Sequence, residues 1–306
     1  MKKQNFNKLP TLNELKDIIA EINAIDLKSI SYDDLITKIR SLQFIPFLTA
    51  KLNKGYHIER ARINKPNEIF TDEKEISYRR DSENIKTYGR ANSLQNSMFY
   101  GAVESDVIKH PRMVNLLETS QIFRDLEKNE IDNADFVMTV GKWRIKETLE
   151  VVELVFDEKS IQNSKDVQKS YEYHLANIRR EMPENAEQFE LILKFFSNQF
   201  SNKNIVHNSD YMISAAYTDL AIGFRGFPGI KYPSVKTDYQ GYNVVLTPTA
   251  VDQFLELEIA AMYRVIKENK KSYILPLKHV TDFGKDNGSF NWIDYKPERF
   301  DINEIK

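Results

Sequence analysis

The feature that most constrains the fold of this chain is a change of hydrophobic spacing along its length. Residues 11–22 and 31–42 carry apolar side chains at helical intervals, and each stretch begins with the spacing of a capping box. Shorter apolar and aromatic runs are typical of strands, and they lie at residues 56–63, 97–100, 143–156 and 244–246. The sequence therefore predicts a chain that combines helices with strands.

Helical spacing returns in the second half of the chain. Residues 158–205 are charged and rich in Gln and Asn, with apolar residues at helical intervals, and they predict a helical insertion. The capping-box spacing of Thr249 and Asp252 predicts a helix that continues to Ile266. The segment Asp286-Asn287-Gly288 predicts the turn of a terminal hairpin.

These segments define a domain organisation. Gly55 is the predicted boundary between an N-terminal helical extension, residues 1–54, and a main domain, residues 55–306. The main domain is expected to contain the insertion and, in residues 250–300, a C-terminal helix and hairpin. Further helices are predicted at residues 112–130 and 211–221.

Composition and charge exclude several classes of partner. The chain has 306 residues, 41% of them hydrophobic, which is enough to bury a core. Its 43 basic and 45 acidic side chains are interspersed, which argues against direct binding to nucleic acid. No stretch approaches the roughly 20 apolar residues that span a bilayer, and polar residues follow Met1 where a signal peptide would be apolar. We therefore expect a cytoplasmic protein without a membrane partner.

Cysteine is absent, which excludes disulfides, thiolate nucleophiles and zinc sites built on sulfur. The five histidines are scattered and lack the i, i+4 spacing of a metal site on a helix. A site assembled from distant carboxylates and histidines stays open, but nothing in the sequence argues for one. We expect no metal.

Three arginines are candidates for binding a dinucleotide, because guanidinium groups make bidentate hydrogen bonds to phosphates. Arg60 and Arg62 share one face of a predicted strand and would point into one cleft. Arg90 follows Gly89 in a turn-like segment, where the backbone can approach a ligand. The alternative for Arg60 and Arg62 is an edge strand that points its charged side chains outward into solvent. The alternative for Arg90 is an ordinary solvated surface arginine.

Three other residue types suit chemistry at a ribose. Glu118 lies among neutral residues, where a half-buried carboxylate would stabilise positive charge on the sugar as a base departs. Tyr100 would stack on a ring or donate a hydrogen bond, and Ser234 would donate to a phosphate or ribose oxygen. The alternative for Glu118 is a glutamate that faces solvent, and the alternative for Tyr100 is an aromatic residue of the core. Ser234 lacks the G-x-S-x-G context of a nucleophile, so binding is its expected role.

Five segments together resemble the RES-domain family, which is named for an arginine, a glutamate and a serine. They are Glu59-Arg60-Ala61-Arg62, Tyr88-Gly89-Arg90-Ala91-Asn92, Ser97-Met98-Phe99-Tyr100-Gly101-Ala102, Leu116-Leu117-Glu118 and Gly229-Ile230-Lys231-Tyr232-Pro233-Ser234. The resemblance covers about residues 55–250. It implies an α+β fold with the mixed sheet core of ADP-ribosyltransferases and flanking helices.

The resemblance also implies a site. Residues of this chain that match the NAD pocket of the family are Arg60, Arg90, Tyr100, Glu118, Ser234 and Asn243. Arg62 would share or replace the role of Arg60. The interval from Tyr100 to Glu118 is long for the family, so Glu104 competes with Glu118 for the catalytic role; the Leu-Leu-Glu context favours Glu118.

The function implied is cleavage of the nicotinamide–ribose bond of NAD, which is a substrate and not a resident cofactor. Phosphate as co-substrate makes the enzyme a phosphorylase, water makes it a glycohydrolase, and a protein acceptor makes it an ADP-ribosyltransferase. Family members of this kind are toxins held inactive by a cognate antitoxin, which is the expected protein partner. The alternative is a binding module that keeps the fold without turnover. The sequence leaves the acceptor and the oligomeric state open.

Overall fold

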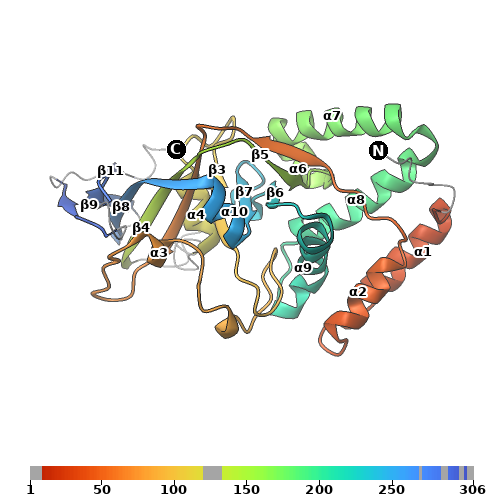
Figure 1. Ribbon diagram of the computed structural model, residues 1–306, viewed down its shortest axis with the longest axis horizontal. Coiled ribbons are helices and arrows are strands. Elements are labelled where there is room, and N and C mark those ends of the chain that lie inside the picture. Colours follow the sequence, from red (N-terminus) through yellow and green to blue (C-terminus); the bar gives the residue numbers. More distant parts are fainter. Residues whose placement is uncertain (1–8, 120–132, 269–270, 284–288, 296–299, 302–306) are drawn as a thin grey trace.

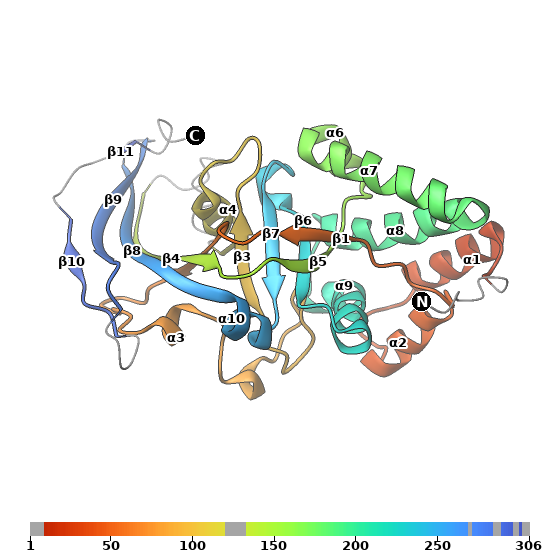
Figure 2. The same ribbon diagram turned by 45° about the horizontal axis from the view of Figure 1, so that its top comes forward.

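The computed structural model describes residues 9–119, 133–268, 271–283, 289–295 and 300–301, and shows an α+β protein built on one mixed sheet (Figures 1 and 2). The strands lie in the order β1-β5-β6-β7-β3-β2-β4-β8-β9-β10, and β11 pairs with β9. Among these described strands, the β5–β6 pair is parallel and the other pairs are antiparallel.

The described residues form helices and strands that are interspersed along the chain. The helices are α1 (Leu12–Asn23), α2 (Tyr32–Arg40), α3 (Glu73–Ile76), α4 (Pro111–Thr119), α6 (Glu158–Asn163), α7 (Lys165–Glu181), α8 (Ala186–Ser201), α9 (Met212–Asp219) and α10 (Pro248–Phe254). The strands are β1 (Thr49–Leu52), β2 (His57–Ile63), β3 (Phe99–Val103), β4 (Ala134–Ile145), β5 (Leu149–Glu153), β6 (Gly229–Pro233), β7 (Tyr242–Leu246), β8 (Leu255–Glu268), β9 (Lys271–Val280), β10 (Ile293–Asp294) and β11 (Phe300–Asp301).

The two N-terminal helices form as predicted and pack on α8 and α9. Thr11 accepts a hydrogen bond from the Glu14 backbone N–H, and the Glu14 carboxylate accepts one from the Thr11 N–H, which completes a capping box. Leu15 and Leu35 are fully buried in a cluster that also contains Tyr217 of α9. Both figures show α1, α2, α8 and α9 gathered at one end of the sheet.

Replacing Thr11 with alanine is expected to lower the free energy of unfolding by about 1 kcal/mol, because the first turn of α1 loses its cap. Urea titration followed by circular dichroism would measure the loss. Thr37→Ala is the matched control, since Thr37 is exposed inside α2. An equal loss in both variants would contradict the role of the cap.

The sheet presents two faces, and the register assigns the candidate residues to them. Ala102 of β3 lies opposite Glu59 of β2 on one side and Asn243 of β7 on the other. Because side chains alternate along a strand, Tyr100 and Asn243 share one face, which we call the Tyr100 face. Arg60 follows Glu59 and belongs to the opposite face, which we call the Arg60 face.

Different elements cover the two faces. On the Tyr100 face, α4 packs on the sheet through Leu116 and Met113, while α8 and α9 pack on Tyr232 and its neighbours. The core of the Arg60 face is built around the fully buried Trp143, with contributions from α3 and α10. The seam between α4 and the α8–α9 pair therefore lies over Tyr100.

Residues 158–205, which the sequence predicts as a helical insertion, are helical as predicted and form α6, α7 and α8. Its last helix buries aromatic side chains, including Phe196 and Phe200, in the cluster shared with α1 and α2. The insertion therefore forms part of the main core.

The helix predicted from Thr249 to Ile266 forms only as far as Phe254, and the prediction is wrong beyond that residue. The N-cap is Thr247, with Pro248 in the first turn, and α10 ends at Phe254. The next residues form β8, which pairs with β4 along its length. Leu255, Glu256, Leu257 and Glu258 alternate between buried and exposed, which is the period of a strand.

Three other predicted elements differ from the structure or fall at least partly outside the residues that the structure describes. The predicted strand 143–156 is divided between β4 and β5, and the additional strand β1 precedes Gly55 and pairs with β5. The helix predicted at 112–130 is described up to Thr119 as α4. The predicted turn at residues 286–288 lies outside the described residues. Among the helices that are described, none is both long and apolar enough to cross a membrane.

Candidate functional site

Glu118, Ser234 and Asn243 meet at one carboxylate oxygen. The Ser234 hydroxyl donates a hydrogen bond of 2.7 Å to Glu118 Oε1, and the Asn243 side-chain amide donates one of 2.9 Å to the same atom. Ser234 and Asn243 are buried and Glu118 is half-buried. The three residues come from the end of β6, from β7 and from α4, so the fold brings them together across more than 100 residues of sequence.

Tyr100 lies on the same face and is fixed through its hydroxyl. The phenol donates to Asn92 Oδ1 at 2.7 Å and accepts from the Ala91 backbone N–H at 3.0 Å. Burial raises the pKa of Tyr100, partly offset by the Ala91 hydrogen bond. At neutral pH the side chain is therefore an uncharged phenol held in one orientation.

Arg90 binds the C-terminal end of α8. Its guanidinium donates to the carbonyl oxygens of Phe200 at 2.6 Å and Asn202 at 3.1 Å, and it lies 5.2 Å from the ring centre of Tyr211. A cation is favourable here because helix carbonyls point outward at a C-terminus. The contact joins the Gly89–Asn92 turn to the helical insertion.

Tyr232 is a residue of this site that sequence reasoning did not select. It is buried between the others, and burial together with the phenol of Tyr100 and the charge of Glu118 raises its pKa, while the charge of Arg90 acts in the opposite direction. Its position directly before Pro233 and Ser234 is the sequence feature that could have indicated Tyr232 as a site residue. We call Glu118, Ser234, Asn243, Tyr100, Arg90 and Tyr232 the Glu118 cluster.

Arg60 lies on the Arg60 face and reaches the backbone of β3. Its Nε donates to the Ser77 carbonyl at 3.2 Å and its Nη1 to the Tyr100 carbonyl at 2.6 Å, while its guanidinium carbon lies 5.3 Å from the ring centre of Phe99. Burial and the charge of Arg62 lower the pKa of Arg60 to about 10, so it stays protonated at neutral pH. Arg60 therefore contacts the Glu118 cluster through the backbone of Tyr100.

Arg62 points to the same face as Arg60, as the strand spacing predicts. It donates to the Glu75 carbonyl and lies 4.9 Å from the ring centre of Phe70. Both arginines thus bind the backbone of residues 75–77 around α3. The fold does not bring their side chains onto the sheet face that carries Glu118.

Glu104 has a different environment from Glu118. It is exposed and forms an ion pair with Lys109 at 3.3 Å. It lines a polar cleft of about 1140 Å³, and Glu118, Ser234 and Asn243 are not among the residues that line this cleft. Of the two glutamates, Glu118 is therefore the one that the fold joins to Ser234 and Asn243.

A buried charge cluster at the same polar cleft was missed by sequence reasoning. Glu153 is 2% exposed, and it bonds the Lys231 ammonium at 2.8 Å, a ring nitrogen of His174 at 3.0 Å and the Ser170 hydroxyl. Burial acts to raise the pKa of Glu153, but hydrogen bonds from His174 and the charge of Lys231 outweigh it and lower the pKa to about 2. A single glutamate thereby links β5, β6 and α7.

This cluster predicts a loss of stability in acid. Because the folded pKa of Glu153 lies below its ordinary value of 4.5, its contribution is complete above about pH 4.5 and declines as the pH falls toward 2. We expect that contribution to be on the order of 3 kcal/mol. Urea unfolding between pH 2 and pH 7 would measure it.

The comparison uses two variants. Glu153→Gln should flatten the acid part of this profile, whereas Glu150→Gln, an exposed position on the same strand, should leave it unchanged. A profile that keeps its shape in Glu153→Gln would assign the acid sensitivity to other groups.

Comparisons with models of known protein families and with curated proteins find no match to this chain.

Proposed function

We propose that this chain degrades NAD by cleaving the bond between nicotinamide and ribose. The observation that carries the proposal is the pair of hydrogen bonds from Ser234 and Asn243 to one oxygen of Glu118. The sequence pattern predicts all three residues for an NAD pocket, and a chance pattern gives no reason for them to converge. Their convergence supports the resemblance to RES domains and an ADP-ribosyltransferase-like arrangement of the sheet.

The chemistry assigns a role to the oriented carboxylate. When the bond from ribose C1′ to the pyridinium nitrogen breaks, its electron pair leaves with neutral nicotinamide and positive charge builds on the ribose. The Glu118 carboxylate stabilises that charge, and the bonds from Ser234 and Asn243 fix its position beforehand. An oxygen of phosphate or water then bonds to C1′ and, for water, releases its proton to solvent.

Two of the remaining candidates would bind the substrate. Within the Glu118 cluster, Tyr100 presents a neutral aromatic ring that would orient the nicotinamide. A guanidinium group has five N–H donors; Arg90 bonds three backbone carbonyls, those of Gln199, Phe200 and Asn202. The remaining donors of Arg90 would bind the pyrophosphate. Arg60 and Arg62 lie on the opposite sheet face, so Arg60 would act on the site only by holding the Tyr100 carbonyl, and we do not propose the substrate contact predicted for Arg62.

An enzyme that consumes NAD endangers the cell that makes it, so we also propose that the chain is a toxin with a cognate antitoxin that occludes the site. We favour phosphate or water over a protein as the acceptor, because within the described residues we identify no surface at the Glu118 cluster that must dock a protein target.

The test is to incubate the purified chain with NAD, with and without phosphate, and to separate nicotinamide from ADP-ribose products by chromatography. Nicotinamide release that requires phosphate would identify a phosphorylase, and release without phosphate a glycohydrolase. No release under either condition would reject NAD cleavage to these acceptors and leave protein modification or a binding module.

A further inference from the structure

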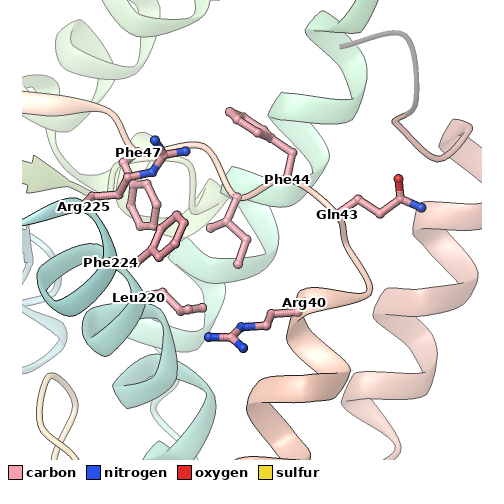
Figure 3. Close-up of a pocket in the computed structure, with 8 residues that line it drawn as sticks. Arg40, Gln43, Phe44, Phe47, Leu220, Phe224 and Arg225 are labelled. Atoms are coloured by element: carbon pink, nitrogen blue, oxygen red, sulfur yellow. The ribbon is translucent and has the colours of Figure 1, made fainter. Parts of the chain in front are cut away.

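A hollow of about 410 Å³ lies where the N-terminal helices meet the end of α9 (Figure 3). Its floor is apolar and includes Phe47, from the segment that leads to β1, and Leu220 and Phe224, from the helical turn after α9. Arg40 at the end of α2 and Arg225 after α9 stand at its rim. No residue of the Glu118 cluster lines it.

The backbone after α9 explains why apolar side chains are presented here. Residues Leu220–Phe224 form a π-helical turn, and Gly226 follows with φ of +74°, a left-handed conformation that favours glycine. The wider turn leaves Phe224 outside the core, and its side chain is 73% exposed. An exposed phenylalanine beside an apolar hollow is a feature of binding surfaces.

The two rim arginines differ from the other arginines that the structure describes. Each of those others bonds a carboxylate, a backbone carbonyl or a tyrosine hydroxyl. Within the described part of the chain, no hydrogen bond or ion pair is recorded for Arg40 or Arg225. Arg225 only stacks on Phe224, 5.3 Å from its ring centre. The hollow therefore combines an apolar floor with two exposed cations that lack an anion.

We propose that this hollow docks a segment of another protein in which a large apolar side chain lies between two acidic residues. In Figure 3 the guanidinium groups of Arg225 and Arg40 lie on opposite sides of the hollow, with Phe47, Phe224 and Leu220 between them. The apolar side chain fills the hollow, and each carboxylate meets one guanidinium. A fatty acid has the apolar part but a single carboxylate, so it satisfies one arginine only.

The test uses the full chain and isothermal titration calorimetry at low salt. The probe is a capped peptide of five residues, glutamate-glycine-phenylalanine-glycine-glutamate. Two comparison peptides carry glutamine for both glutamates, or alanine for the phenylalanine. We expect saturable binding of the first peptide and at least fivefold weaker binding of each comparison peptide. Octanoate, titrated separately, represents the small amphiphile.

The variants locate the binding. Arg40→Gln and Arg225→Gln should each weaken the peptide two- to fivefold, and the double variant about tenfold, as expected for exposed charge pairs. Arg180→Gln is the control, because Arg180 is exposed on α7 and pairs with Glu181. Circular dichroism would show that the variants are folded.

Three results would overturn the proposal. They are no saturable binding of the acidic peptide up to several millimolar, equal binding by the double variant, and binding of octanoate in the hollow without binding of the peptide. None of these depends on NAD turnover, so the result is separate from the proposed enzyme activity.

Discussion

Glu118→Gln is expected to lower the rate of nicotinamide release from NAD by about 100- to 1000-fold. Glutamine keeps the size and the hydrogen-bonding shape of the side chain but removes the negative charge that would stabilise the ribose cation. Because the loss concerns the transition state, kcat should fall much more than KM rises. Steady-state assays of nicotinamide release would measure both.

The matched control is Glu104→Gln. Glu104 is the competing glutamate of the sequence pattern, and it lies exposed beside Lys109. Its substitution should change the rate less than twofold. A large loss in Glu104→Gln together with an active Glu118→Gln variant would transfer the catalytic role to the polar cleft.

Trp143→Ala is expected to lower the free energy of unfolding by about 3–5 kcal/mol, the largest effect on stability that we predict. Trp143 is fully buried on the Arg60 face, and its ring meets that of Phe99 edge-on at a centroid distance of 5.4 Å. Alanine would leave a cavity between β4 and β3. Urea titration at pH 7 would measure the loss.

Trp143→Phe is the informative comparison. The indole Nε1 is buried, and no hydrogen-bond partner is found for it among the residues described. Phenylalanine removes this unsatisfied donor while it keeps an aromatic ring, so a loss of no more than about 1.5 kcal/mol is expected. Equal losses in the two variants would contradict this account, because they would mean that the phenyl ring recovers none of the packing of the indole.

The comparison of sequence with structure shows which local signals were sufficient. Thr11 and Glu14 predict the start of α1 correctly because a capping box is complete within four residues. The segment after Phe254 was predicted as a helix because its apolar residues fit both periods, and the long pairing of β8 with β4 decides in favour of the strand. That pairing joins residues more than 100 positions apart, which no local pattern contains.

In the candidate site, too, local sequence signals indicate the residues, and contacts between distant segments decide their arrangement. The sequence selects Glu118 and Ser234 by residue type and context, and Asn243 through the resemblance to RES domains, but their shared hydrogen bonds depend on how α4 packs across β7. The strand period correctly predicts that Arg60 and Arg62 share a face. The strand period does not predict that Tyr100 lies on the other face of the sheet. That placement follows from the pairing of Glu59 in β2 with Ala102 in β3, which the sequence does not reveal.

The packing of α1 and α2 on α8 and α9 has a consequence during synthesis on the ribosome. The apolar faces of the first two helices find their core only after residues near Tyr217 have emerged, almost 180 positions after Ile39. At about 5–20 residues per second, the nascent chain holds these faces without their partners for roughly ten to forty seconds. A chaperone that binds amphipathic helices would act in this interval, and a chain truncated before α9 would lack the partner of α2.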